Sequence, residues 1–247
     1  MSTPPAELPG YAAAGIAAAD AFSHVDTWVF DLDNTLYSAH AALFGQVDQR
    51  IKAFITHRLS LDPEAAYRLQ KDLYRRYGTS LRGLMTEYGI PADDFLDYVH
   101  DIDHSVLDPD PALAEALARL PGRRFIMTNG THGHARKTAD RLGITQHFDG
   151  IFDIVAADLI PKPEAAAYGS FFAQHAIRPE SAAMFEDLSR NLVVPHAEGM
   201  KTVLVLPAGE LPVFRQTWGI EGRSEPHVDF ATDDLAGFLG ALGSSVG

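Results

Sequence analysis

The most constraining feature of this chain is a short apolar run, Trp28–Phe30, that ends abruptly in two acids on alternate residues, Asp31 and Asp33. Residues two apart on an extended chain point the same way, so both carboxylates are expected at the carboxyl end of a buried strand. Two like charges this close are unfavourable unless a cation or a proton lies between them. The pair therefore indicates a chemical role, although acids at a strand end can also simply begin a turn or cap the next helix.

A long stretch with helical spacing and no strand pattern follows this run. Val47 and Ile51 share one face of a predicted helix. Asp62 is placed to cap a second helix, and Gly78 is placed to end it. We therefore expect residues 40–107 to form a small all-helical insert.

After this insert the sequence changes to alternating helices and strands. Helices of this length between strands imply right-handed crossovers and a mostly parallel sheet. The predicted fold is α/β, with a Rossmann-like core at 24–39 and 108–247, a helical cap at 40–107 and an N-terminal tail at 1–23. A loop at 208–227 is expected to border the site. Further strands are expected at 125–127, 151–156, 182–185, 203–206 and 228–230, and helices at 112–120, 135–142, 165–175, 188–198 and 233–242.

In a sheet of this kind the working groups lie beyond the carboxyl ends of the strands. Polar residues follow the second and fourth expected strands as well as the first, and a lysine lies in the loop after the third. Each group also has an ordinary interpretation, as a turn, a solvated loop residue or a helix cap. Their shared placement predicts one site. The residues in question are Thr128, Asn129, Gly130, Lys162, Glu186 and Asp187.

The composition restricts the partners and the compartment. The net charge of -13 argues against a nucleic-acid polymer or an anionic membrane surface, although a cleft can still bind a small anion. The chain has no cysteine, which excludes a disulfide and a thiolate nucleophile. The stretch Met1–Phe22 contains no Lys or Arg and so lacks the basic start of a secretory signal, and no segment is long and apolar enough to span a bilayer. We therefore expect a cytoplasmic protein.

The eleven histidines are scattered along the chain and do not form a metal-binding set. Two of them, His132 and His134, follow the second expected strand. We expect both to be loop residues that are either solvated or adjacent to the substrate.

Taken together, the motifs resemble the haloacid dehalogenase superfamily of phosphohydrolases over about residues 28–206. The position of the helical insert is similar to that in the members of the superfamily that carry a cap. The matching positions are Asp31–Thr35 for the first motif, Thr128 for the second, Lys162 for the third, and Glu186 with Asp187 for the fourth.

The resemblance implies a role for each of these positions. Asp31 would attack phosphorus and form an aspartyl phosphate, while Asp33 would protonate the leaving oxygen and later deprotonate the attacking water. The implied cofactor is Mg²⁺, held by Asp31, the backbone carbonyl of Asp33 and Asp187, with Glu186 as an indirect or alternative ligand. The implied phosphate-binding residues are Asp31, Thr128, Asn129, Gly130 and Lys162.

Several segments around the motifs look like the pyrimidine 5′-nucleotidase branch. They are Leu36-Tyr37, Tyr77–Leu84, Thr128–Gly130 followed by His134-Ala135, Lys162-Pro163 followed by Tyr168, and Phe185–Asn191. This resemblance implies a nucleoside monophosphate, UMP or CMP, as the substrate. Gly130 and Glu186 depart from that branch, where Ala and Asp are frequent. A phosphatase for phosphoglycolate or sugar phosphates, a phosphomutase similar to β-phosphoglucomutase and an idle binding protein stay open as alternatives.

Carbon–halogen cleavage is disfavoured, because the dehalogenases of the superfamily lack the acid at Asp33. Aromatic and basic residues of the cap are candidates to contact the substrate, although such residues can also be ordinary surface or packing residues of a helical insert. These candidates are Tyr74, Arg75, Tyr77, Thr79 and Arg82.

Overall fold

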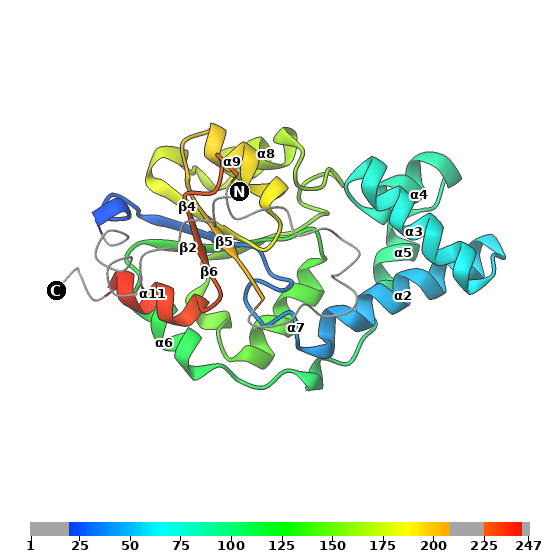
Figure 1. Ribbon diagram of the computed structural model, residues 1–247, viewed down its shortest axis with the longest axis horizontal. Coiled ribbons are helices and arrows are strands. Elements are labelled where there is room, and N and C mark those ends of the chain that lie inside the picture. The colour runs from blue at the N-terminus through cyan, green and yellow to red at the C-terminus, as the bar shows by residue number, and fades with distance from the viewer. Residues whose placement is uncertain (1–19, 208–224, 244–247) are drawn as a thin grey trace, which may run out of the picture.

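The centre of the structure is a six-stranded sheet with the strand order β3-β2-β1-β4-β5-β6 (Figure 1). The computed structural model describes residues 20–207 and 225–243. All neighbouring strands are parallel, which confirms the predicted α/β fold. The order places β1 between β2 and β4, so groups that follow these three strands meet at one edge. The strands are β1 (Thr27–Phe30), β2 (Arg123–Met127), β3 (Gly150–Phe152), β4 (Ala182–Glu186), β5 (Lys201–Val205) and β6 (Phe230–Thr232).

Helices cover both faces of the sheet, with α8 and α9 on one side and α6, α7 and α11 on the other (Figure 1). The side chains of alternate residues of β1 pack on opposite faces of the sheet, as the two-residue period of a strand requires. Trp28 and Phe30 belong to the apolar cluster that includes α6, α7 and α11, whereas Val29 packs in the cluster that includes α8. The helices are α6 (Pro111–Arg119), α7 (His132–Leu142), α8 (Ala165–His175), α9 (Val193–Ala197) and α11 (Leu235–Gly243).

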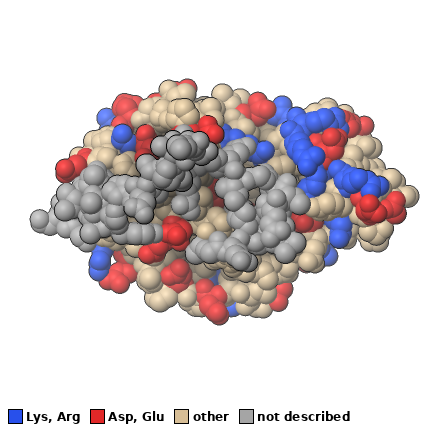
Figure 2. Space-filling view, in the orientation of Figure 1, with Lys and Arg blue, Asp and Glu red and all other residues tan. Residues whose placement is uncertain are grey.

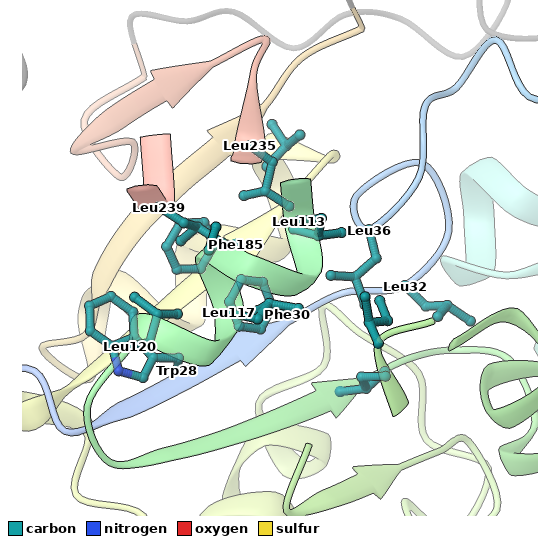
Figure 3. Packing of buried hydrophobic residues seen from close by; sticks show 14 of the residues in the cluster. Trp28, Phe30, Leu32, Leu36, Leu113, Leu117, Leu120, Phe185, Leu235 and Leu239 are labelled. Atoms are coloured by element: carbon teal, nitrogen blue, oxygen red, sulfur yellow. The ribbon is translucent and has the colours of Figure 1, made fainter. Parts of the chain in front are cut away.

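Aromatic side chains fill the larger of the two clusters (Figure 3). The rings of Phe30 and Phe185 are fully buried and stack with their centroids 4.8 Å apart. Trp28 is also buried, and its indole Nε1 donates to the carbonyl of Pro121 at 2.7 Å, so its one polar group is satisfied. Phe22 stacks on Trp28 with the ring centroids 6.0 Å apart. The described end of the segment predicted as a tail is therefore docked on the core.

Helices α2 to α5 form a helical unit beyond one end of the sheet (Figure 1). The unit has an apolar cluster of its own, in which Ile55, Leu73 and Leu84 are fully buried. Asp62 caps α3 by accepting hydrogen bonds from the amides two and three residues later, at 3.0 and 2.9 Å, and Gly78 ends the helix with φ 79°. Both ends of α3 therefore lie where the sequence predicts them. The helices are α2 (Ala42–Leu59), α3 (Pro63–Tyr77), α4 (Ser80–Tyr88) and α5 (Ala92–Val99).

The strand predicted at 151–156 is shorter than expected and ends at Phe152. Asp153 begins a turn there, because its side chain accepts hydrogen bonds from the amides of Ala156 at 2.9 Å and His132 at 2.7 Å. These bonds replace the ladder that a longer strand would need. They also tie the end of β3 to the start of α7.

The helix predicted at 188–198 is divided in two. A 3-10 turn, Ser189–Leu192, precedes the short α9. The chain leaves β4 in a bend that the amide of Leu188 closes by donating to Glu186 Oε2 at 2.7 Å. This bend keeps Glu186 at the strand end and delays the helix.

The last strand, β6, lies two residues later than the strand predicted at 228–230. Most of the loop predicted at 208–227 lies outside the described residues. None of the helices in the described ranges has both the length and the apolar character needed to cross a bilayer.

Candidate active site

The chain turns sharply after β1, and this turn presents Asp31 at the edge of the sheet. The Asp31 amide continues the parallel ladder by donating to the carbonyl of Phe185 at 2.9 Å. Asn34 then adopts the left-handed region with φ 65°, and the amide of Leu36 donates back to the carbonyl of Leu32 at 3.0 Å. As a result, the Asp31 side chain lies beside β4 and is only 7% exposed.

Lys162 lies at the centre of the site. Its Nζ donates to Asp31 Oδ1 at 2.7 Å, to Glu186 Oε1 at 2.8 Å and to the carbonyl of Met127 at 2.8 Å. All three protons of the buried ammonium group are therefore used. Two carboxylates from adjacent strands and one lysine from a distant loop form a single buried network.

Asn129 fixes the loop that carries Lys162. Its Oδ1 accepts from the Lys162 amide at 2.8 Å, and its Nδ2 donates to the Lys162 carbonyl at 3.2 Å. The side chain of Asn129 is therefore occupied in holding the loop. Any contact of this residue with a phosphoryl group is left to its backbone.

Thr128 lies at the end of β2, buried beside the same site. Its Oγ1 accepts a hydrogen bond from the Gly130 amide at 2.9 Å. A Cβ atom at Gly130 would lie 3.2 Å from the ring of His134 and 3.3 Å from Thr128 Oγ1. Gly130 is thus needed for close packing, and its amide is already used within the turn.

The network contains two carboxylates and one ammonium group. Burial and the charges of these neighbours together shift the pKa of each member. Burial raises the pKa of Asp31 to about 7, against the opposing effect of Lys162 and with a further contribution from Glu186. Burial alone would lower the pKa of Lys162, but the two carboxylates hold it well above its usual value, so the group stays charged. Burial likewise opposes ionisation of Glu186, yet Lys162 and the Leu188 amide keep its pKa low.

The same region can hold a metal ion. Asp31, Glu186 and Asp187 each offer a carboxylate oxygen, and these oxygens lie within 4.8 Å of one another. One ammonium group does not balance three carboxylates, and an all-oxygen donor set suits a hard divalent cation such as Mg²⁺. Both oxygens of Glu186 already accept hydrogen bonds, from Lys162 and Asn191 on Oε1 and from Leu188 on Oε2. Asp31 and Asp187 are therefore better placed than Glu186 as direct ligands.

Asp33 has surroundings that the sequence analysis does not anticipate. Its Oδ1 accepts from the Tyr37 hydroxyl at 2.6 Å and lies 2.9 Å from His134 Nε2. Burial would raise the pKa of Asp33, but His134 and Tyr37 hold it below the usual range. His134 is 2% exposed and, like His132, lies in α7, so the expectation of two loop residues is wrong.

The burial of His134 can be inferred from the spacing of residues in the sequence. Thr138 and Ala139 follow His134 and Ala135 by four positions on one face of α7, and all four residues are buried. This helical spacing indicates that His134 faces the core. Its contact with Asp33 joins residues 101 positions apart, and no local pattern records it.

A cavity of about 160 Å³ lies between the edge of the sheet and the helical unit. The sheet side is polar and includes Asp31, Asp33 and Lys162. The opposite wall is largely apolar. Its residues from the helical unit include Phe44, Val47, Ile51, Leu81, Phe95, Leu96 and Val99.

Two of the five predicted substrate contacts, Tyr74 and Thr79, line this cavity. Arg75, Tyr77 and Arg82 are not among its lining residues. The Tyr77 hydroxyl instead donates to Glu87 at 2.7 Å on the surface. Thr79 caps α4, where its Oγ1 accepts from the Arg82 amide at 3.2 Å.

Arg190 is a lining residue that the sequence analysis does not single out. Its guanidinium carbon lies 4.3 Å from the centre of the Tyr74 ring. Arg190 lies in the 3-10 turn that follows β4, and Tyr74 lies in α3. This cation–π contact therefore joins the sheet side of the cavity to the helical unit.

Comparisons with known proteins agree with this architecture. Residues 25–192 match the family described as haloacid dehalogenase-like hydrolase. Phosphate metabolism protein 8 of Saccharomyces cerevisiae is 34% identical over 134 residues, which make up 49% of this chain and 41% of the yeast protein. The chain therefore matches less than half the length of that relative.

Solved structures share the fold at low sequence identity. L-2-haloacid dehalogenase from Xanthobacter autotrophicus superposes with a TM-score of 0.55 and 16% identity, over 90% of this chain and 98% of the dehalogenase. A HAD phosphatase from Thermococcus onnurineus gives a TM-score of 0.56 and 16% identity, over 84% and 93% of the two chains. At this identity both likenesses concern the fold alone.

Proposed function

The chain belongs to the haloacid dehalogenase-like hydrolase family, and we propose that it is a Mg²⁺-dependent phosphomonoester hydrolase with an aspartyl-phosphate intermediate. The observation that carries the proposal is the pair Asp31 and Asp33 in one cavity. Asp31 is bound to the ammonium group of Lys162, whereas Asp33 has separate partners in Tyr37 and His134. Two acids with such different surroundings can act as nucleophile and as proton carrier.

In the first step, an Asp31 oxygen forms a bond to phosphorus while the bond from phosphorus to the ester oxygen breaks. Lys162 supports this attack, because its positive charge favours the ionised form of Asp31. Thr128 and Lys162 lie where they can stabilise the charge of the transferring group. Bound Mg²⁺, held by Asp31, Asp187 and the Asp33 carbonyl, would offset the negative charge of the carboxylates and the phosphoryl oxygens.

Asp33 moves the proton in both steps. Its low pKa makes it a carboxylate at rest, and an anionic ester bound beside it raises that pKa so that it takes up a proton. The proton passes to the leaving oxygen. In the second step Asp33 removes a proton from the water that attacks the aspartyl phosphate, and inorganic phosphate leaves.

This need for a proton favours phosphate esters over carbon–halogen bonds. A halide leaves as an anion without protonation, so an acid at Asp33 would have nothing to do in the first step of a dehalogenase. An alkoxide is a poor leaving group and requires that acid.

For the substrate we propose a pyrimidine nucleoside monophosphate, UMP or CMP. The wall opposite the acids is apolar and includes the ring of Tyr74, which suits a flat base. A hexose phosphate or phosphoglycolate would place more of its hydroxyl or carboxylate groups against the apolar side chains of that wall. The cytoplasmic location predicted from the sequence stays a prediction.

A phosphate-release assay with Mg²⁺ over nucleotides, sugar phosphates and phosphoglycolate tests the proposal. We expect UMP and CMP to be hydrolysed fastest and chelation of the metal to stop turnover. Faster hydrolysis of phosphoglycolate or a hexose phosphate would overturn the substrate, and interconversion of sugar phosphates would indicate a mutase. No release from any ester would overturn the phosphatase itself.

A further inference from the structure

Three histidines from three elements meet beside Asp33. His100 follows the last turn of α5, His104 lies in the 3-10 turn His104–Val106, and His134 lies in the first turn of α7. His104 and His134 are buried, and His100 is partly buried on the wall of the cavity. The proposed reaction assigns no bond-making or proton-transfer step to any of the three.

His134 is the member that touches Asp33. Its Nε2 lies 2.9 Å from Asp33 Oδ1, the same oxygen that accepts from the Tyr37 hydroxyl at 2.6 Å. Among the described residues, the side-chain hydrogen bonds of Asp33 thus all end on Oδ1. This arrangement leaves Oδ2 as the oxygen for proton transfer in the cavity.

The other two histidines hold the His134 ring. His104 Nε2 lies 3.1 Å from His134 Nδ1, and the His100 ring stacks on that of His134 with centroids 4.7 Å apart and an interplanar angle of 17°. His100 is itself bound, with Nδ1 3.3 Å from Thr131 Oγ1. A ring held at one nitrogen and on one face cannot rotate away from Asp33.

The two nitrogen contacts of His134 are compatible with one order of donors and acceptors. If His104 Nε2 donates to His134 Nδ1, then His134 must carry its proton on Nε2 and donate it to Asp33. Burial lowers the pKa of His104 and lowers that of His100 to about 4, so neither neighbour adds a competing positive charge near neutral pH.

We propose that His134, held by His104 and His100, is a positioning residue that keeps the carboxyl group of Asp33 in the orientation for proton transfer. The proposal rests on the phosphatase function above. A carboxyl group at the end of two rotatable bonds needs such support, because proton transfer requires hydrogen-bond distance and alignment. Because His100 belongs to the helical unit, the placement of that unit contributes to the orientation of Asp33.

A purely structural role makes a different prediction. If the three rings only fill the space between α5 and α7, a substitution lowers the amount of folded enzyme and reduces turnover of every ester by the same factor. A positioning role instead depends on how much the leaving group needs a proton. That difference can be measured.

The test compares His134→Gln with His134→Leu, which have similar volumes. Only the glutamine offers an N–H near the position of the imidazole Nε2. The substrates are p-nitrophenyl phosphate, whose leaving group departs without a proton, and UMP or the fastest alkyl ester of the substrate panel. His132→Gln is the matched control, because His132 is exposed in the same turn of α7 and does not line the cavity.

For His134→Leu we expect kcat for the alkyl ester to fall about 100-fold, with KM changing far less. With p-nitrophenyl phosphate the same variant should release one nitrophenolate per enzyme rapidly and then turn over slowly, because Asp33 is still needed to activate water. His134→Gln should recover most of kcat, and His132→Gln should match the wild type.

An equal loss of turnover on both esters without a burst, an unchanged kcat in His134→Leu, or a failure of His134→Gln to restore kcat in a folded protein would each overturn the positioning role. These results presuppose an active wild type. A wild-type protein that hydrolyses neither ester would instead refute the phosphatase function and the present inference with it.

Discussion

The two sides of the cavity are built on different physical principles. On the sheet side, buried charges are held by one another, as in the contacts of Lys162 with Asp31 and Glu186. On the side of the helical unit, the wall is apolar, and charges lie mainly outside, as in the exposed pair Arg68–Glu64. Figure 2 shows Lys and Arg side chains gathered over the helical unit at one end of this face.

The two sides of the cavity should therefore differ in how well they tolerate amino-acid substitutions. A buried charge that loses its partner is strongly destabilising, so the groups on the sheet side have little freedom. Apolar packing accepts substitutions that keep the total volume. We infer that the chemistry is fixed by the sheet side and that the choice of substrate can vary with the helical unit. The predictions below test this division, beginning with the largest effect.

Substitution Asp31→Asn should abolish turnover while the fold is kept. The amide has nearly the same shape but no anionic oxygen to attack phosphorus, so we expect a loss of at least about 10⁴-fold in kcat. Phosphate release with Mg²⁺ measures the activity, and circular dichroism checks the fold. Substantial turnover by this variant would mean that the sheet side does not supply the nucleophile.

Two buried lysines allow a direct comparison of the two sides. Lys162 binds Asp31 and Glu186, and Lys71 of the helical unit binds Asp48 at 2.9 Å, with side-chain exposures of 8% and 15%. Replacing Lys162 by methionine leaves two buried carboxylates without their cation and should lower the free energy of unfolding by about 3 kcal/mol. Lys71→Met should cost less, because Asp48 keeps the hydrogen bond that Gln70 Nε2 donates to its Oδ1 at 2.8 Å.

Only Lys162→Met should also remove activity, by about 10³-fold, because only Lys162 contacts the proposed nucleophile. Chemical denaturation and phosphate release on the same two variants provide the measurements. If Lys71→Met lost as much activity as Lys162→Met in a folded protein, the assignment of the chemistry to the sheet side would be wrong.

How well a feature could be predicted from the sequence depends on whether its cause is local, follows from the sheet topology or lies in the packing of distant side chains. Asp31, Thr128, Lys162 and Glu186 converge as expected, because parallel strands bring their carboxyl ends to one edge. The limits of α3 were also predictable, since Asp62 and Gly78 act through local hydrogen bonds and backbone conformation. In both cases the determining pattern is local or follows from topology.

Contacts between distant side chains were not predictable in this way. The contact of His134 with Asp33 and that of Arg190 with Tyr74 depend on how α7 and the helical unit pack against the sheet. The short β3 was missed because the carboxylate of Asp153 accepts from α7 as well as from its own turn. Spacing in one sequence does not encode such pairings.

The raised pKa of Asp31 predicts that the folded protein becomes less stable as this carboxyl group ionises to the form that can act as a nucleophile. Its folded-state pKa of about 7 exceeds the usual 3.8, so the folded protein binds this proton more tightly than the unfolded chain. The stabilising contribution is complete below about pH 4 and is lost as pH rises to about 7.

Asp31→Asn removes the titrating carboxyl group, and with it the loss of stability at high pH. In chelator, the variant and the wild type should have similar melting temperatures near pH 4, and the variant should melt several degrees higher near pH 8. Adding Mg²⁺ at pH 8 should stabilise the wild type and reduce or reverse the difference. Thermal denaturation across pH checks this. Melting temperatures that differ by a constant amount at every pH would contradict the assigned pKa.

The smallest effect is expected on the side of the helical unit, from Tyr74→Leu. Leucine keeps the wall apolar but removes the aromatic ring that lies over Arg190 and faces the cavity. We expect KM for UMP to rise about 5-fold with little change in kcat, because an aromatic contact is worth about 1 kcal/mol and lies away from the reacting atoms. Tyr88→Leu, at the exposed end of α4, should leave both constants unchanged. A fall in kcat rather than a rise in KM would place Tyr74 with the catalytic groups and would show that the two sides of the cavity do not divide the work as proposed.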